Sequence, residues 1–268
     1  ELLRGQQDPN SPFPLILFLL TFSLLISCFL IIRHVIEAQG FNVFFNIELW
    51  HFFRSIYHPA IEKVAIIISF IFSPLSYILI WCVFSIYFLM KGKYNLLWHW
   101  FVLGCFSIGI PGILKHAFYL PRPGGLLGVP FDSSFPSGHV ALSASFLPFI
   151  AILISKEYEQ IIKIRIIFAS ILSVLIIAAC RLYLGVHWFS DIFAGMLIGF
   201  TICFSVLISL FRENCHFPSK KPILTLLFII MSFSLVSQYL LIYPKQILAY
   251  QPSWPEIYID EENWWQHG

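Results

Sequence analysis

Three short segments of this sequence place ionisable and small polar residues at the borders of long apolar runs. They are Lys115–Pro123, Phe135–His139 and Arg181–Asp191. Ionisable groups at or within membrane spans are energetically costly, and they indicate function by default. Leaving aside His116, the segments together supply three cations, two imidazoles, one carboxylate and one small polar turn. These are the group types that a phosphoryl-transfer site requires.

The cations and the small turn predict an anion-binding site. Lys115, Arg122 and Arg181 can hold an oxyanion with two or three negative charges, and the guanidinium groups make bidentate contacts. Ser137 and Gly138 precede a predicted helix, whose first backbone N–H groups form a ready anion site. A glycine there lets the backbone approach the ligand closely.

The histidines predict covalent chemistry at that anion. His187 and Asp191 lie at i and i+4, so on a helix they would share a face. A carboxylate bonded to one ring nitrogen fixes the tautomer and leaves the other nitrogen free to attack. His139 is a second imidazole that can hand a proton to a leaving oxygen. The set therefore favours phosphoryl transfer through a phosphohistidine.

The polar residues also allow other interpretations. A zinc site built from His139, His187 and Asp191 is an alternative, although three nearby cations would repel the metal. The six cysteines show no C-x-x-C spacing, which supports neither a disulfide framework nor zinc. Residues 132–134 (Asp-Ser-Ser) are expected only to make the loop turn.

The composition defines the kind of scaffold that positions these groups. The chain has 268 residues, of which 59% are hydrophobic and 11% charged. Soluble domains have about 45–50% apolar and about 25% charged residues. We therefore expect an all-α, polytopic transmembrane helical bundle. The net charge of +2, without a basic run, argues against nucleic acid as a partner. Because residue 1 is Glu rather than Met, we expect a processed or trimmed amino terminus, and an upstream domain or partner is left open.

Apolar runs of about 20 residues predict the spans. Seven stretches qualify or nearly do: 13–33, 64–90, 97–115, 138–155, 164–186, 189–211 and 222–243. We divide the chain into an N-terminal span with an interfacial segment (1–63), a catalytic core (64–211), and an extra C-terminal span with an acidic, Trp-rich tail (212–268). The aromatic segment 41–59 is predicted to form interfacial helices, with a lid or lipid guide over the site as the alternative.

The basic residues predict the orientation of the bundle. With the amino terminus inside, the inner segments hold nine of the sixteen basic residues, and the positive-inside rule then places the polar motifs outside. These nine are Arg4, Lys91, Lys93, Lys156, Lys163, Arg165, Arg212, Lys220 and Lys221. We expect an integral protein of a bacterial inner membrane whose site faces the periplasm.

At the three motifs the sequence resembles the type-2 phosphatidic acid phosphatase superfamily. The family pattern is K-x6-R-P, then P-S-G-H, then S-R-x5-H-x3-D. All three occur here in order over about residues 60–211, with Cys180 in place of the usual Ser as the single departure. The resemblance implies a six-helix core, so the run 222–243 would be a seventh span.

The resemblance also implies a role for each motif residue and the absence of any metal or cofactor. His187 would be the nucleophile, Asp191 its orienting partner and His139 the general acid. The phosphate would be bound by Lys115, Arg122, Ser137, Gly138 and Arg181.

The expected function is that of a membrane lipid phosphate phosphatase acting at the outer leaflet on a lipid partner. We rank undecaprenyl diphosphate first, because three cations suit concentrated charge. Lipid A 1-phosphate and phosphatidylglycerophosphate follow. A lipid-to-lipid phosphotransferase would use the same residues, and an inactive scaffold or transporter is the non-enzymatic alternative. A haloperoxidase would need bound vanadate and an aqueous halide site, which a membrane bundle disfavours.

Overall fold

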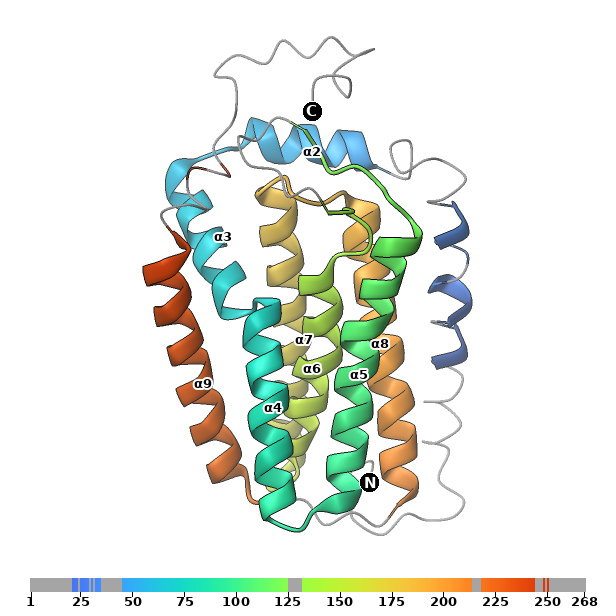
Figure 1. The fold of residues 1–268 in the computed structure, drawn as a ribbon, viewed down its shortest axis with the longest axis vertical. Coiled ribbons are helices and arrows are strands. Elements are labelled where there is room, and N and C mark those ends of the chain that lie inside the picture. The colour runs from blue at the N-terminus through green and yellow to red at the C-terminus, as the bar shows by residue number, and fades with distance from the viewer. Residues whose placement is uncertain are drawn as a thin grey trace.

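The computed structural model describes residues 45–124, 132–213 and 218–243, most of 21–34, and positions 248 and 250. All regular structure in these residues is helical (Figure 1). The helices in chain order are α2 (Asn46–Ser55), α3 (Pro59–Ile71), α4 (Pro74–Met90), α5 (Tyr94–Ala117), α6 (Gly138–Ser155), α7 (Gln160–Tyr183), α8 (Phe189–Arg212) and α9 (Lys220–Leu241). A shorter apolar helix, Thr21–His34, precedes them. The all-helical prediction is confirmed.

Among the described residues, six helical stretches are long and apolar enough to cross a membrane. The extra C-terminal span predicted at 222–243 is confirmed as a helix of spanning length, α9. The span predicted at 13–33 lies partly outside the described residues. The tail 252–268 lies wholly outside them.

The predicted span 64–90 needed correction. It begins earlier, at Pro59, and it consists of two helices, α3 and α4. Phe72 and Ser73 lie between them and interrupt the span. The Ser73 hydroxyl accepts a hydrogen bond from the Ser76 N–H at 3.2 Å, and Pro74 occupies the first helical position. A serine N-cap followed by proline is a strong helix-start signal, which hydropathy alone does not register.

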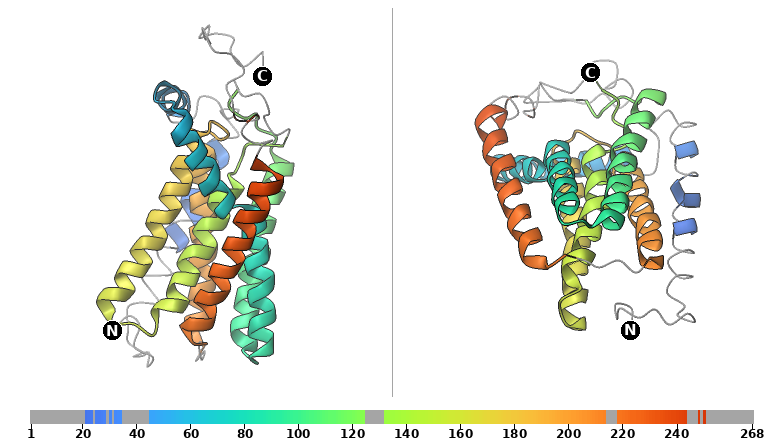
Figure 2. Two further views of the ribbon diagram at one scale, coloured as in Figure 1. Left: turned by 90° about the vertical axis from the view of Figure 1, so that its left-hand side faces the viewer. Right: turned by 60° about the horizontal axis from the view of Figure 1, so that its bottom comes forward.

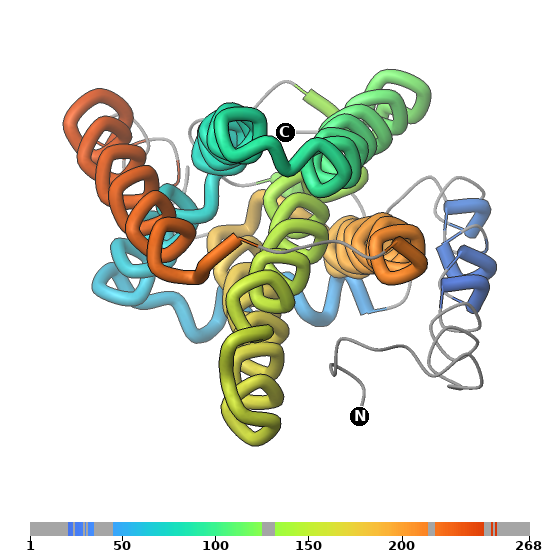
Figure 3. The backbone as a smooth tube through the Cα atoms, turned by 90° about the horizontal axis from the view of Figure 1, so that it is seen from below, coloured from blue at the N-terminus to red at the C-terminus, as the bar shows by residue number. Residues whose placement is uncertain are grey.

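From α4 onward the helices alternate in direction, so their ends gather at two opposite ends of the bundle (Figure 1). In the left view of Figure 2, α2 lies at the upper end, and the turn between α6 and α7 lies at the lower end. Seen from below, α6 lies at the centre of the bundle (Figure 3). It packs most extensively against α8 and α7.

Glycines allow α6 and α8 to approach closely. A Cβ atom added at Gly199 would lie 2.4 Å from the carbonyl oxygen of Ala141, and one at Gly195 would lie 2.8 Å from that of Ser137. Small residues at membrane helix interfaces allow such backbone contact. This contact fixes the start of α8 beside the start of α6.

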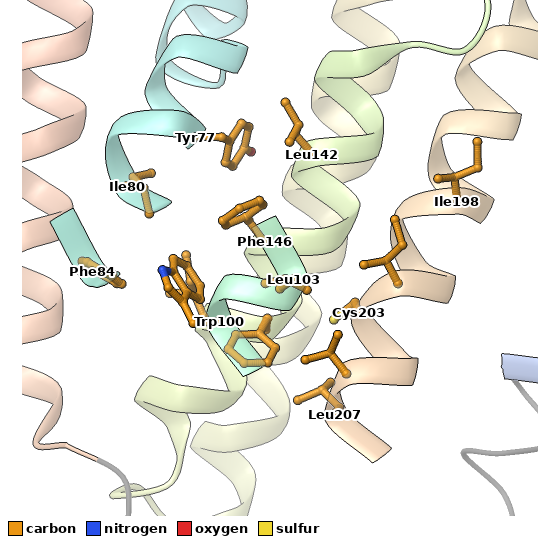
Figure 4. Close-up of a cluster of buried hydrophobic side chains, with 14 of the residues drawn as sticks. Tyr77, Ile80, Phe84, Trp100, Leu103, Leu142, Phe146, Ile198, Cys203 and Leu207 are labelled. Atoms are coloured by element: carbon orange, nitrogen blue, oxygen red, sulfur yellow. The ribbon is translucent and has the colours of Figure 1, made fainter. Parts of the chain in front are cut away.

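Aromatic side chains fill the core between α4, α5 and α6 (Figure 4). The Trp100 ring meets the Phe146 ring edge to face, with centroids 5.1 Å apart and planes at 88°. Phe84 and Tyr77 are also buried against this cluster. By contrast, large apolar side chains such as Phe228 are exposed on the outside of the bundle, as expected of a surface that faces lipid.

Candidate active site

Four helix ends meet at the end of the bundle that α2 crosses (Figure 1). There α5 and α7 end, and α6 and α8 begin. The structure brings all eight predicted site residues to this end. Lys115 lies in the last turn of α5, Arg122 in the following loop, Ser137 at the N-cap of α6, Gly138 and His139 in its first turn, Arg181 in the last turn of α7, His187 in the next loop, and Asp191 in the first turn of α8.

His187 and Asp191 form a buried pair. Their Nδ1 and Oδ2 atoms lie 3.4 Å apart, and the side chains are only 3% and 1% exposed. The backbone N–H of Trp188 donates to the same Oδ2 at 2.8 Å, so Asp191 also caps α8. The expectation that both residues share a helix face is wrong. His187 precedes α8, and the extended N-cap residue Trp188 turns the imidazole back over the helix start.

The other nitrogen of His187 faces the predicted cations. Nε2 lies 3.5 Å from Nη1 of Arg122. That guanidinium is held in place because its Nη1 also donates to the carbonyl oxygen of Val186 at 2.8 Å. One ring nitrogen thus faces a carboxylate, while the other faces the proposed anion site.

Asp132 joins two of the cations, which sequence reasoning missed. Its carboxylate accepts from Nη2 of Arg122 at 2.6 Å and lies 3.3 Å from Nζ of Lys115. Lys115 also donates to the carbonyl oxygen of Ser133. The segment 132–134 therefore does more than turn the chain. The available signal was a lone acidic residue between two basic motifs.

Several buried polar atoms at this end of the bundle have no hydrogen-bond partner among the described residues. Among them are Oγ of Ser137, Nε of Arg181 and Nδ1 of His187. Most buried polar groups in proteins are hydrogen-bonded, so each exception requires an explanation. Ser137 and Arg181 are hydrogen-bond donors, which suits an anionic ligand.

The start of α6 supplies further donors and open space. The first intrahelical bond runs from the Ala141 N–H to the Ser137 carbonyl oxygen, and earlier N–H groups of a helix have no acceptor within it. A Cβ atom added at Gly138 would meet nothing within 4 Å. An oxyanion can therefore approach the backbone at Gly138.

The electrostatics keep His187 neutral and Asp132 ionised. Burial, followed by the charges of Arg122, Arg181 and Lys115, lowers the pKa of His187 well below 6.5. At Asp132 burial opposes ionisation, but Arg122 and Lys115 outweigh it and lower the pKa of the carboxyl. His139 interacts electrostatically with the same three cations. A neutral imidazole keeps the lone pair that nucleophilic attack needs.

Comparison with known proteins places this constellation in a family. Residues 96–215 match the family model of the PAP2 superfamily. This part of the chain is therefore similar to the PAP2 superfamily. The match includes every predicted site residue, and α9 follows it.

Individual relatives extend the comparison. An uncharacterized 22.5 kDa protein in the cps region of Klebsiella pneumoniae is 31% identical over 117 residues, which are 43% of this chain and 54% of that protein. The match thus spans about half the length of that relative. The crystal structure of a transmembrane PAP2-type phosphatidylglycerolphosphate phosphatase from Bacillus subtilis has 20% identity and a TM-score of 0.61, covering 70% of this chain and 94% of its own. Aquifex aeolicus LpxE has 23% identity and a TM-score of 0.48, covering 62% and 96%. The Bacillus likeness shows a shared fold.

Contacts from outside the three motifs hold the PAP2 site together. The Asn46 amide exchanges two hydrogen bonds with Ser190, at 3.0 Å to its hydroxyl and 2.9 Å from its backbone N–H. These bonds attach α2 beside Asp191. The Trp188 indole donates to the carbonyl oxygen of Pro121 at 2.9 Å, which joins the loop after α5 to the start of α8. Sequence spacing gives no signal for Asn46, because 144 residues separate it from its partner.

No metal-binding set is evident in the part of the chain that the structure describes. Within it, no three His, Cys, Asp or Glu side chains lie close enough together to hold a metal ion.

Proposed function

We propose that this protein is a metal-independent phosphatase of membrane lipid phosphates that works through a phosphohistidine at His187. One observation carries the proposal. A buried imidazole faces a carboxylate with one nitrogen and a group of cations with the other. This arrangement orients a nucleophile toward an anion, and the segment that matches the PAP2 superfamily contains all of it.

The first step of the proposed reaction forms the phosphoenzyme. Phosphate oxygens bind Lys115, Arg122, Arg181 and the first N–H groups of α6. Nε2 of His187 attacks the terminal phosphorus, and the bond from that phosphorus to the leaving oxygen breaks. The leaving oxygen belongs to the lipid alcohol in a monophosphate and to the lipid monophosphate in a diphosphate. His139 gives its proton to that leaving oxygen. With phosphorus on Nε2 and a proton on Nδ1, the ring of His187 is a cation, and the adjacent Asp191 carboxylate stabilises its charge.

The second step releases phosphate and restores the enzyme. His139, now neutral, removes a proton from water, and the resulting oxygen attacks phosphorus. The bond from phosphorus to Nε2 breaks, His187 regains its lone pair and inorganic phosphate leaves. A lipid hydroxyl in place of water would make the protein a phosphotransferase.

The position of the site supports a lipid substrate. The motif residues lie at the ends of spanning helices, where lipid headgroups reside, rather than in a separate polar domain. Among lipid phosphates we place undecaprenyl diphosphate first, because three cations match its concentrated charge. Lipid A 1-phosphate and phosphatidylglycerophosphate are the next candidates.

The distribution of charge supports a site on the outer face of a bacterial inner membrane. Eight basic residues lie at or near the opposite ends of the spans, in the turns between α4 and α5, between α6 and α7, and between α8 and α9, or in the adjoining helix ends. The positive-inside rule assigns that end to the cytoplasm. The site then faces the periplasm.

The test is phosphate release by purified protein in detergent from these three lipids, with p-nitrophenyl phosphate as the soluble comparison. We expect a far higher kcat/KM for at least one lipid, and no turnover by His187→Ala. Equal efficiencies would contradict the lipid assignment but leave the phosphatase chemistry standing. Transfer of phosphate to an added lipid alcohol without release would favour the phosphotransferase. No reaction with any phosphate would favour the scaffold or transporter.

A further inference from the structure

The Asp132 carboxylate forms ion pairs with two of the three cations that the proposed function assigns to substrate binding. Its carboxylate is bonded to Nη2 of Arg122 at 2.6 Å and lies 3.3 Å from Nζ of Lys115. The backbone carbonyl of Asp132 also accepts from Nε of Arg122 at 3.2 Å. One carboxylate therefore fills donor positions that a phosphate group would need.

The Arg122 and Asp132 side chains differ in how far they are exposed. The Arg122 side chain is 6% exposed and is anchored to Val186, whereas that of Asp132 is 53% exposed. Arg122 is thus buried and anchored, whereas the carboxylate is half-exposed, so the carboxylate is the partner that can withdraw into solvent. The Asp132 carboxylate and a phosphate cannot bind the same N–H groups at once. Their negative charges would also repel strongly at such distances.

We propose that Asp132 is an internal counter-ion that the incoming phosphoryl group displaces from Lys115 and Arg122, and that it thereby sets the affinity of the site for phosphate. The proposal rests on the proposed function, because it takes the same cations as the phosphate site. Asp132 contributes to specificity rather than to bond breaking.

The consequence differs between free and lipid-linked phosphate. Displacement of Asp132 costs the same free energy for every phosphate that enters. A lipid substrate offsets this cost through its membrane-embedded chains, but inorganic phosphate has no such contribution. Asp132 therefore keeps the product weakly bound and favours its release. It also keeps soluble phosphate from occupying the site.

Neutralising Asp132 tests the inference. We expect Asp132→Asn to tighten the binding of inorganic phosphate and orthovanadate about tenfold, since pairs between a partly exposed carboxylate and a cation are modest in strength. Asp132→Ala also removes the charge and should tighten binding in the same way. If one of the two variants fails to fold, the other still tests the prediction. Asp132→Glu keeps the charge and should stay near wild type. Binding is measured by isothermal titration calorimetry on the full-length protein in detergent.

The matched control is Glu157→Gln, which makes the same charge change at the other end of the bundle, where Glu157 pairs with Lys220. This control should leave the affinity unchanged. Weaker binding in Asp132→Asn and Asp132→Ala would overturn the inference, because Asp132 would then position the cations. Unchanged binding would overturn it as well.

A second control separates this inference from the proposed function. Arg181→Ala removes a proposed phosphate contact that Asp132 does not touch, so it should abolish phosphate binding in the wild-type and Asp132→Asn backgrounds. If Arg181→Ala leaves binding intact, the phosphate site itself is wrongly placed, and the inference fails with it. If Arg181→Ala abolishes binding but Asp132→Asn has no effect, only the inference fails.

Discussion

Arg181 allows the sharpest separation of function from stability. It is 5% exposed, and its Nε has no hydrogen-bond partner in the described part of the chain. A buried charge without a partner destabilises a protein, and replacing it with a well-packed apolar side chain is often neutral or stabilising. We therefore expect Arg181→Met to abolish activity while its melting temperature stays equal to that of wild type or rises.

Arg181→Lys tests the geometry of the same contact. The variant keeps the positive charge but loses the guanidinium fork, and with it at least one hydrogen bond to the phosphate. Hydrogen bonds to charged groups contribute about 1.5–3 kcal/mol. Because 1.4 kcal/mol corresponds to a factor of ten, kcat/KM should fall about 10- to 150-fold.

The assay measures lipid phosphate hydrolysis and thermal unfolding on the same preparations. Arg165→Lys provides the control, since it makes the same substitution on α7 at the other end of the helix and at an exposed position. It should leave both measurements unchanged. Phosphate should raise the melting temperature of wild type but not of Arg181→Met. Unfolding of Arg181→Met, or wild-type activity in Arg181→Lys, would refute the reasoning.

Three further predictions follow from the site. The pKa of His187 is lowered, so the imidazole stays unprotonated as the pH falls, and the acid limb of kcat/KM should lie below pH 6.5. Arg122→Gln removes one cause of the lowered pKa and should move that limb to higher pH. If the limb does not move, it reports the titration of another group. Activity should survive EDTA and be inhibited by orthovanadate, which occupies the cation site; loss on chelation with recovery on added zinc would establish a metal mechanism instead. In a cysteine-free background, Tyr119→Cys should react with an impermeant thiol reagent from the periplasmic side and Lys91→Cys only from the cytoplasmic side, and the reverse pattern would contradict the orientation.

Much of the fold followed from the sequence because membrane spans carry a strong local signal. Hydropathy and length located α5 to α9 closely, since about 20 apolar residues are needed to cross. The break between α3 and α4 was missed, because it depends on the Ser73 cap and Pro74 rather than on hydropathy. The hydrogen bond from the Gln238 amide to the Phe70 carbonyl oxygen was equally invisible, since it joins helices far apart in the chain.

At the site, spacing predicted which residues would gather but not how they would meet. The motif pattern indicated His187 and Asp191 as a pair, yet the pairing arises from capping of α8 rather than from a shared helix face. Asp132 and Asn46 act through contacts between distant segments, with partners that local patterns do not reveal. Long-range hydrogen bonds and ion pairs become visible only once the helices are placed.

The most direct test of the central claim is to trap the phosphoenzyme. A brief reaction of the purified protein with a phosphorus-32-labelled lipid phosphate, stopped in alkali, should leave label that is stable to base, labile to acid and located by peptide mapping at His187. His187→Ala should carry none. His139→Ala should still become labelled with a substrate that has a good leaving group, since proton donation contributes only about 10²–10⁴-fold. Label on another residue, or normal turnover by His187→Ala, would contradict the account.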